Sequence, residues 1–92
     1  TITTNHNSNM KLIATIDPGH GWLRVPIKLL ERLNIVDKIS HYSYKAASYA
    51  FLEEDCDWGV FARAMEKNGL QYTVEPQTLN EDSIIRQYES FR

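Results

Sequence analysis

The chain has 92 residues and a net charge of −2 at neutral pH, and 42% of its residues are hydrophobic. This length suits one domain, and this hydrophobic fraction excludes wholesale disorder. The single cysteine, Cys56, excludes a disulfide within the sequence, and no apolar run is long enough for a transmembrane helix. Residues 1–9 lack the basic cluster and apolar stretch of a signal peptide, so we expect a cytoplasmic protein.

The first part of the chain predicts two strands and a helix. Residues 1–9 are polar and aperiodic, and we expect a flexible segment there, ahead of one domain over residues 10–92. Pro26 suits the first position of a helix, because its missing N–H needs no partner there. The expected elements are, in order, a strand, a tight loop, a second strand and an amphipathic helix: Met10–Ile16, Asp17–Gly21, Trp22–Val25 and Pro26–Asn34.

The remaining elements complete a mostly antiparallel α+β fold with two helices on one face of the sheet. A hairpin is expected from His41–Lys45 and Ser48–Glu53, around Ala46 and Ala47. The next helix carries Trp58, Phe61, Ala62 and Met65 on one face, with Asp55 or Asp57 as its N-cap and Gly69 after its end. The last expected elements are a strand that ends before Pro76 and, at Ile84–Tyr88, either a strand or a short helix.

Basic and aromatic residues alternate through the first half of the chain and predict a surface for a nucleic acid or a nucleoprotein partner. Lys28 and Arg32 are one turn apart on the expected helix, so they share a face. Phosphate groups attract such cations, and bases stack on aromatic rings. An ordinary solvated helix face is the alternative. The candidate partner-binding residues are Arg24, Lys28, Arg32, Lys38, Tyr42 and Lys45.

A run of acidic residues precedes the second helix and offers a second surface, suited to the lysines and arginines of a partner protein. The simpler interpretation is that these acids offset the positive end of the helix dipole. Neither an EF-hand pattern nor a second carboxylate cluster accompanies the run, so we expect no metal site and no cofactor. Cys56 lies within the run, and we expect a buried, unreactive thiol. The acidic residues are Glu53, Glu54, Asp55 and Asp57.

The loop from Asp17 to His20 combines a carboxylate with an imidazole, which leaves a small enzyme as a further possibility. The sequence contains no phosphate-binding loop, nucleophile elbow or zinc-protease motif. Turn chemistry accounts for Pro18, Gly19 and Gly21. We therefore expect a protein that binds macromolecules, with no catalytic residues and no small-molecule substrate.

Three stretches, Gly19–Pro26, Tyr42–Tyr44 and Phe51–Asp57, resemble a group of small proteins encoded by phages and other mobile elements. In its length, phage-like character and lack of catalytic motifs, the chain is similar to type I-F anti-CRISPR proteins. The resemblance implies a stoichiometric inhibitor in the bacterial cytoplasm. Such an inhibitor would dock on a crRNA-guided surveillance complex of Cas proteins, with possible contact to the crRNA, and block recognition of target DNA. A structural or assembly module of a phage particle is the alternative.

Overall fold

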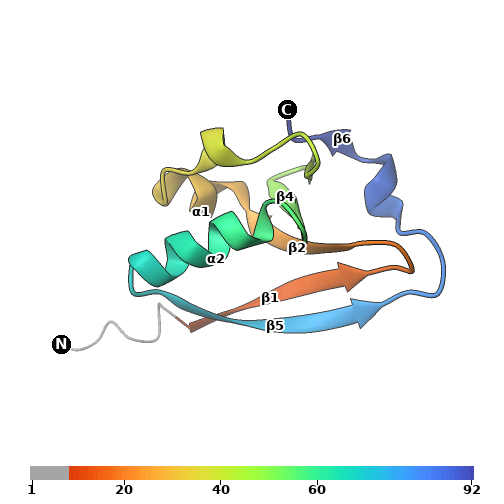
Figure 1. Ribbon diagram of the computed structural model, residues 1–92, viewed down its shortest axis with the longest axis horizontal. Coiled ribbons are helices and arrows are strands. Elements are labelled where there is room, and N and C mark those ends of the chain that lie inside the picture. The colour runs from red at the N-terminus through yellow and green to blue at the C-terminus, as the bar shows by residue number, and fades with distance from the viewer. Residues whose placement is uncertain (1–8) are drawn as a thin grey trace.

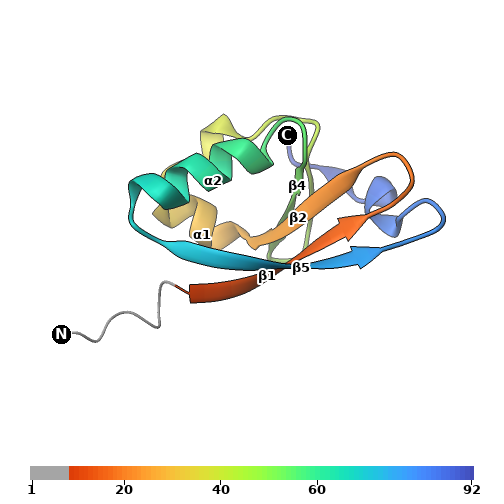
Figure 2. The ribbon, with the colours of Figure 1, turned by 60° about the horizontal axis from the view of Figure 1, so that its bottom comes forward.

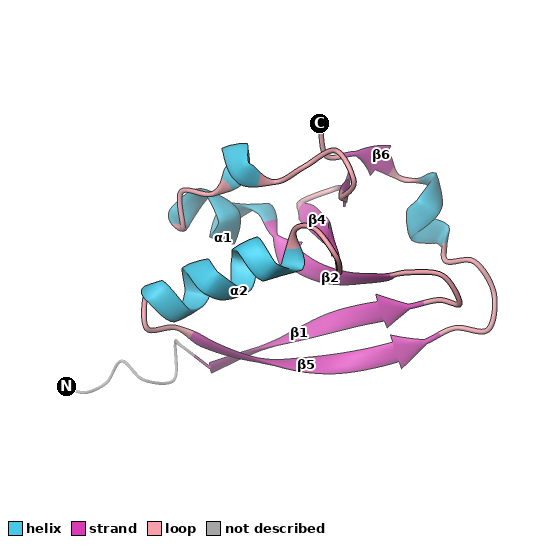
Figure 3. Ribbon diagram, in the orientation of Figure 1, coloured by secondary structure: helices cyan, strands magenta, loops and turns pink. Residues whose placement is uncertain are grey.

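The strands of the computed structural model form one mixed sheet in the order β5-β1-β2-β4-β3-β6 (Figures 1 and 3). The structure describes residues 9–92, so the flexible segment expected over residues 1–9 lies outside the described residues apart from Asn9. Neighbouring strands are antiparallel except β1 and β5, which are parallel, and the expected α+β fold is confirmed. The strands are β1 (Asn9–Ile16), β2 (Gly21–Pro26), β3 (Tyr44–Ala46), β4 (Tyr49–Glu53), β5 (Gln71–Thr78) and β6 (Glu89–Ser90).

The helices cover one face of this sheet (Figure 2). They are α1 (Ile27–Arg32), the short 3₁₀ turn η2 (Val36–Lys38) and α2 (Trp58–Lys67). Pro26 was predicted to open the helix, but it is the last residue of β2, with a φ of −59° and an extended ψ of 133°, and α1 begins one residue later. Gly69 follows α2 with a φ of +69°, which matches the expected helix end. Among residues 9–92, no helix combines the length and apolar character needed to cross a membrane.

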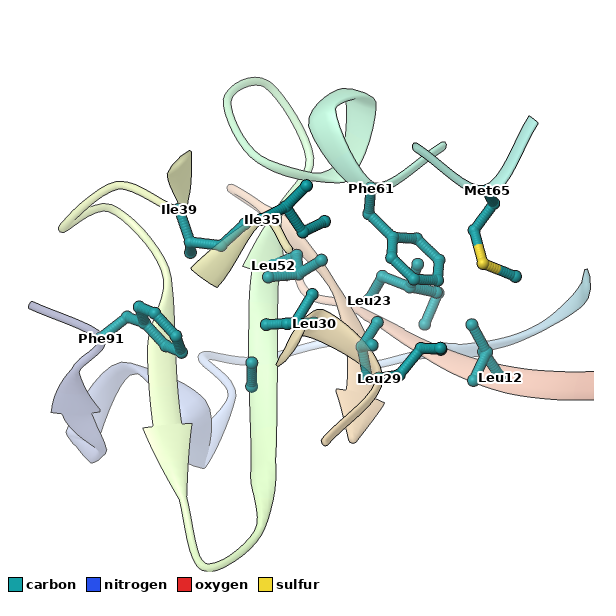
Figure 4. Packing of buried hydrophobic residues seen from close by; sticks show 13 residues of the cluster. Leu12, Leu23, Leu29, Leu30, Ile35, Ile39, Leu52, Phe61, Met65 and Phe91 are labelled. Carbon is teal, nitrogen blue, oxygen red and sulfur yellow. The ribbon is translucent and has the colours of Figure 1, made fainter. Parts of the chain in front are cut away.

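The hydrophobic core lies between the sheet and the helices (Figure 4). Side chains alternate between the two faces of a strand, so Leu23 of β2 and Leu52 of β4 are paired and point into the core together. From α2, Phe61 and Met65 pack against the same layer, as the helical spacing predicted. The largest side chains that are almost completely buried are Phe61, Leu23, Leu30, Ile39, Leu52, Met65 and Val25.

The hairpin turn is formed by residues 47–48, and β3 begins three residues later than predicted. Three further local predictions need correction. The strand β5 does not end before Pro76 but continues to Thr78. It lies at the edge of the sheet, where a proline can leave its missing N–H on the open side. Asp57 stands at the N-cap position of α2, yet its side chain makes no capping hydrogen bond. For Ile84–Tyr88 the helical alternative is correct: Ile84–Gln87 is the 3₁₀ turn η3, and the strand β6 comes after it.

We predict that Phe61→Ala lowers the free energy of unfolding by about 3–5 kcal/mol, because it leaves a cavity where a fully buried ring packs against the sheet. Urea denaturation followed by circular dichroism measures the change. Glu66→Ala is the matched control, since Glu66 is exposed on the same helix. A denaturation midpoint of Phe61→Ala equal to that of the control would contradict the packing of α2.

Candidate functional site

A pocket of about 280 Å³ brings together residues from distant parts of the chain. Paired across β2 and β4, Trp22 and Glu53 alternate with the core residues Leu23 and Leu52, so they lie on the sheet face turned away from the helices. All three stretches that stood out in the sequence contribute to this pocket, which we call the aromatic–acidic pocket. It is lined by His20, Trp22, Tyr42, Tyr44, Glu53, Asp55, Cys56 and Arg86.

The buried carboxylate of Asp17 fixes one wall of the aromatic–acidic pocket. One oxygen accepts hydrogen bonds from the backbone N–H groups of Gly19 and His20, at 3.0 and 2.9 Å. Arg86 donates to both oxygens, at 2.7 and 2.8 Å, and the N–H of Ser83 donates at 2.9 Å. These donors, Arg86 above all, hold the pKa of Asp17 well below its usual range despite burial. The loop that carries His20 is therefore joined to the segment that carries Arg86.

A second buried carboxylate, Asp57, holds the loop that carries Tyr42. It accepts hydrogen bonds from the hydroxyls of Ser40 and Ser43, at 2.7 and 2.5 Å, and from the N–H of Ser40 at 3.0 Å. The hydroxyl of Ser43 in turn accepts from the N–H of Glu53. The loop that carries Tyr42 is thus tied to the turn after β4. These bonds explain why Asp57 does not cap α2.

The expected acidic surface is divided by these contacts. Glu54 and Asp55 are exposed, whereas Glu53 and Asp57 are only 7% and 2% exposed. Glu53 Oε2 lies 3.3 Å from His20 Nδ1, and Glu53 Oε1 accepts from the N–H of Asp55 at 2.8 Å. Sequence reasoning treated His20 and the acidic run separately, because 33 positions separate His20 from Glu53.

Trp22 forms the floor of the pocket and is 2% exposed. The guanidinium of Arg86 lies 5.4 Å from the centre of its ring, and the rings of His20 and Tyr44 lie at 6.0 and 6.3 Å. The indole Nε1 of Trp22 is buried without a hydrogen-bond partner in the described part of the chain. The pocket therefore combines aromatic surface with charged groups of both signs.

Two glycines leave room for charged side chains at the rim of the pocket. A Cβ atom at Gly19 would lie 2.9 Å from Arg86 Nη2, and one at Gly21 would lie 2.9 Å from Glu54 Oε1. Positive φ angles are recorded for Asn34, Ala47 and Gly69, and not for these two glycines. Close approach of side chains, and not turn conformation, is thus the physical reason that glycine suits both positions.

Cys56 is exposed at the pocket, which corrects the expectation of a buried thiol. The pKa of Cys56 is raised by partial desolvation, by a hydrogen bond to Glu53 and by the negative charges of Glu53, Asp57 and Asp55. The thiol therefore stays protonated at neutral pH and is a poor nucleophile there.

A larger hollow of about 480 Å³ lies where the segment after α1 meets α2, and we call it the basic groove. Lys38, Arg63 and Lys67 contribute the charged groups, and no acidic residue lines it. Within residues 9–92, no ion pair joins any of these three cations to a carboxylate. The lining residues are Leu33, Asn34, Ile35, Lys38, Val60, Arg63, Ala64, Lys67 and Asn68.

The structure does not bring the six predicted partner-binding residues together. Lys28 and Arg32 are exposed on α1, and Lys38 lines the basic groove. Arg24 lies on the other face of the sheet, with its guanidinium 4.7 Å from the ring centre of Tyr49. Lys45 lies on β3, 3.9 Å from Glu89, and Tyr42 lines the aromatic–acidic pocket.

Arg63 and Lys67 of the basic groove were missed in the sequence. They are four residues apart on α2, so the spacing that placed Lys28 and Arg32 on one face also applies to them. No pattern in the sequence indicated that this face of α2 lies beside Lys38.

Comparison of the chain with protein-family models, with curated proteins and with solved structures gave no match. The interpretation of both sites therefore rests on their own chemistry.

We predict that Asp17→Asn destabilises the protein at pH 7 and flattens the dependence of its stability on pH in acid. Because the pKa of Asp17 is lowered on folding, its ionised form contributes stability above the unfolded pKa of about 3.9. That contribution is lost as the pH falls below this value. Urea denaturation at pH 7 and at pH 3 measures both effects. Asp37→Asn is the control, since Asp37 is exposed on η2, and stability curves parallel to wild type for Asp17→Asn would refute the assignment.

Proposed function

We propose that this protein is a non-enzymatic inhibitory binding protein that docks through the basic groove onto phosphate groups of a host protein–RNA complex. The observation that carries the proposal is the convergence of Lys38, Arg63 and Lys67 on one groove without carboxylate partners in the described part of the chain. Cations without a carboxylate partner attract a polyanion. When such cations bind phosphate groups, the counterions bound to the phosphates are released, which favours association.

The shape of the groove suits a nucleic acid strand. Leu33, Ile35, Val60 and Ala64 provide apolar surface between the cations. A volume of about 480 Å³ lies within the ordinary range for ligand sites. Sugar or base surface can therefore pack against the apolar lining while phosphate oxygens meet the charged groups around it.

Two further cations lie on α1, the helix that precedes the groove. Lys28 and Arg32 are exposed on α1, which leads directly into the groove residues Leu33, Asn34 and Ile35. Neither forms an ion pair with a carboxylate within residues 9–92. Lys28 and Arg32 are therefore candidates for additional phosphate contacts, as predicted from the sequence.

The aromatic–acidic pocket supports the absence of catalysis. The raised pKa of Cys56 disfavours a thiolate nucleophile. Within the described residues, His20 makes its side-chain hydrogen bond with Glu53, and no serine or cysteine is bonded to its ring. A nucleophile beside a base is the arrangement that covalent catalysis requires.

A crRNA-guided type I-F surveillance complex is the first candidate partner, because the chain is similar to type I-F anti-CRISPR proteins. Docking on RNA phosphates near the path of the target strand would block recognition of target DNA. The identity of this partner is inferred from the resemblance alone, whereas the basic groove supports contact with phosphate groups.

We predict that the double reversal Arg63→Glu with Lys67→Glu weakens binding to this purified complex about tenfold or more, because two attractions become repulsions. Biolayer interferometry at two salt concentrations measures the affinity and its salt dependence. Wild-type binding should weaken as salt rises, and the reversal should reduce that dependence. Circular dichroism checks folding, which should be unaffected because both side chains are exposed.

The matched control is Lys11→Glu with Lys45→Glu, which changes the net charge by the same amount at two strand positions outside the groove. An equal loss of affinity in both double variants would mean that only the overall charge matters. If both reversals bind normally while Glu54→Lys with Asp55→Lys fails, the acidic surface contacts a basic protein and the proposed groove is wrong.

A further inference from the structure

We propose that His20, Glu53 and Glu54 form a binding site for one divalent metal ion of the zinc class, separate from the basic groove. One ligand atom from each of these residues lies within 4.8 Å of the other two. His20 comes from the turn between β1 and β2, Glu53 ends β4, and Glu54 follows it. Imidazole nitrogen and carboxylate oxygen are both zinc ligands.

The distance between two of these atoms is also compatible with a shared metal ion. His20 Nδ1 and Glu53 Oε2 are 3.3 Å apart. Two ligands about 2.0–2.1 Å from a tetrahedral zinc ion lie about 3.3–3.4 Å from each other. A charge-assisted hydrogen bond between nitrogen and oxygen would be shorter, about 2.7–2.9 Å. Little rearrangement of this pair is needed to admit an ion.

Hydrogen bonds outside the three ligands hold them in place. The backbone N–H of His20 donates to Asp17, and that of Glu54 donates to the carbonyl of Gly21 at 2.9 Å. The second oxygen of Glu53 is held by the N–H of Asp55. Such outer contacts orient metal ligands and raise affinity, because less freedom is lost on binding.

Gly21 contributes by leaving space. A Cβ atom at this position would lie 2.9 Å from Glu54 Oε1 and 3.3 Å from Glu54 Cδ. Any other side chain would therefore push the Glu54 carboxylate out of its present place beside His20 and Glu53. Glu54 is exposed and can move, so Gly21→Ala should displace a ligand without disturbing the core.

The carboxylates of the site are not paired with a lysine or an arginine in the described part of the chain. One of them, Glu53, is only 7% exposed. A buried carboxylate is costly without a positive partner. Calcium and magnesium prefer all-oxygen ligands, whereas the imidazole of His20 selects a transition metal.

Isothermal titration of chelator-treated protein with Zn²⁺ tests the proposal. We expect one equivalent to bind to the wild-type chain, with no comparable heat from Mg²⁺. His20→Ala, Glu54→Gln and Gly21→Ala should each weaken binding about tenfold or more, since even the loss of an outer contact has that effect. Zn²⁺ should also raise the melting temperature of the wild type and not that of His20→Ala.

His41→Ala and Glu89→Gln are the controls, because His41 and Glu89 are exposed and lie outside the cluster. Both should bind Zn²⁺ as the wild type does. Wild-type protein that binds no Zn²⁺ would overturn the proposal, as would unchanged affinity in His20→Ala and Glu54→Gln. The basic-groove variant Arg63→Glu with Lys67→Glu should keep its Zn²⁺ site, so the two proposals can fail separately.

Discussion

Burial of the Asp17 carboxylate is the constraint on which the aromatic–acidic pocket depends. A charge this deeply buried requires strong partners, and Asp17 has them in Arg86, Ser83 and the backbone of its own turn. The same bonds that satisfy Asp17 hold η3 against the strands and place Arg86 over Trp22. The turn that Asp17 holds also positions His20, which is one ligand of the proposed metal site. Loss of this single carboxylate would separate the turn that carries His20 from the segment that carries Arg86.

The helix α2 connects the two sites. It begins directly after the acidic turn of the aromatic–acidic pocket, and its residues Arg63 and Lys67 line the basic groove. Acidic residues before a helix and basic residues near its end both interact favourably with its dipole. One helix therefore joins the acidic turn of the aromatic–acidic pocket to the cations of the basic groove. Carboxylates precede the first turn of this helix, and Lys67 lies in its last turn.

Local signals in the sequence predicted most helices and strands, but they could not predict the order of the strands in the sheet. The spacing of Phe61 and Met65 fixed the buried face of α2, and Gly69 marked its end. Pro76 was misread because a proline stops a central strand and is tolerated at an edge, and no local signal says which strand is at the edge. Gly21 was predicted as a turn residue, but a Cβ atom there would also crowd Glu54, a residue that the β2–β4 pairing brings near.

The parallel pairing of β1 with β5 has a consequence for how the chain folds. β1 pairs with its neighbour β2 in a local hairpin, as β3 does with β4, but its other edge pairs with the distant β5. The contact of Asp17 with Arg86 likewise spans 69 positions. Closing such long loops lowers the entropy of the chain before any contact stabilises it, so we expect these contacts to form late. During synthesis on the ribosome, β1 emerges well before β5, and its open edge stays available to other chains. The growing chain is therefore most exposed to aggregation in the interval before β5 arrives.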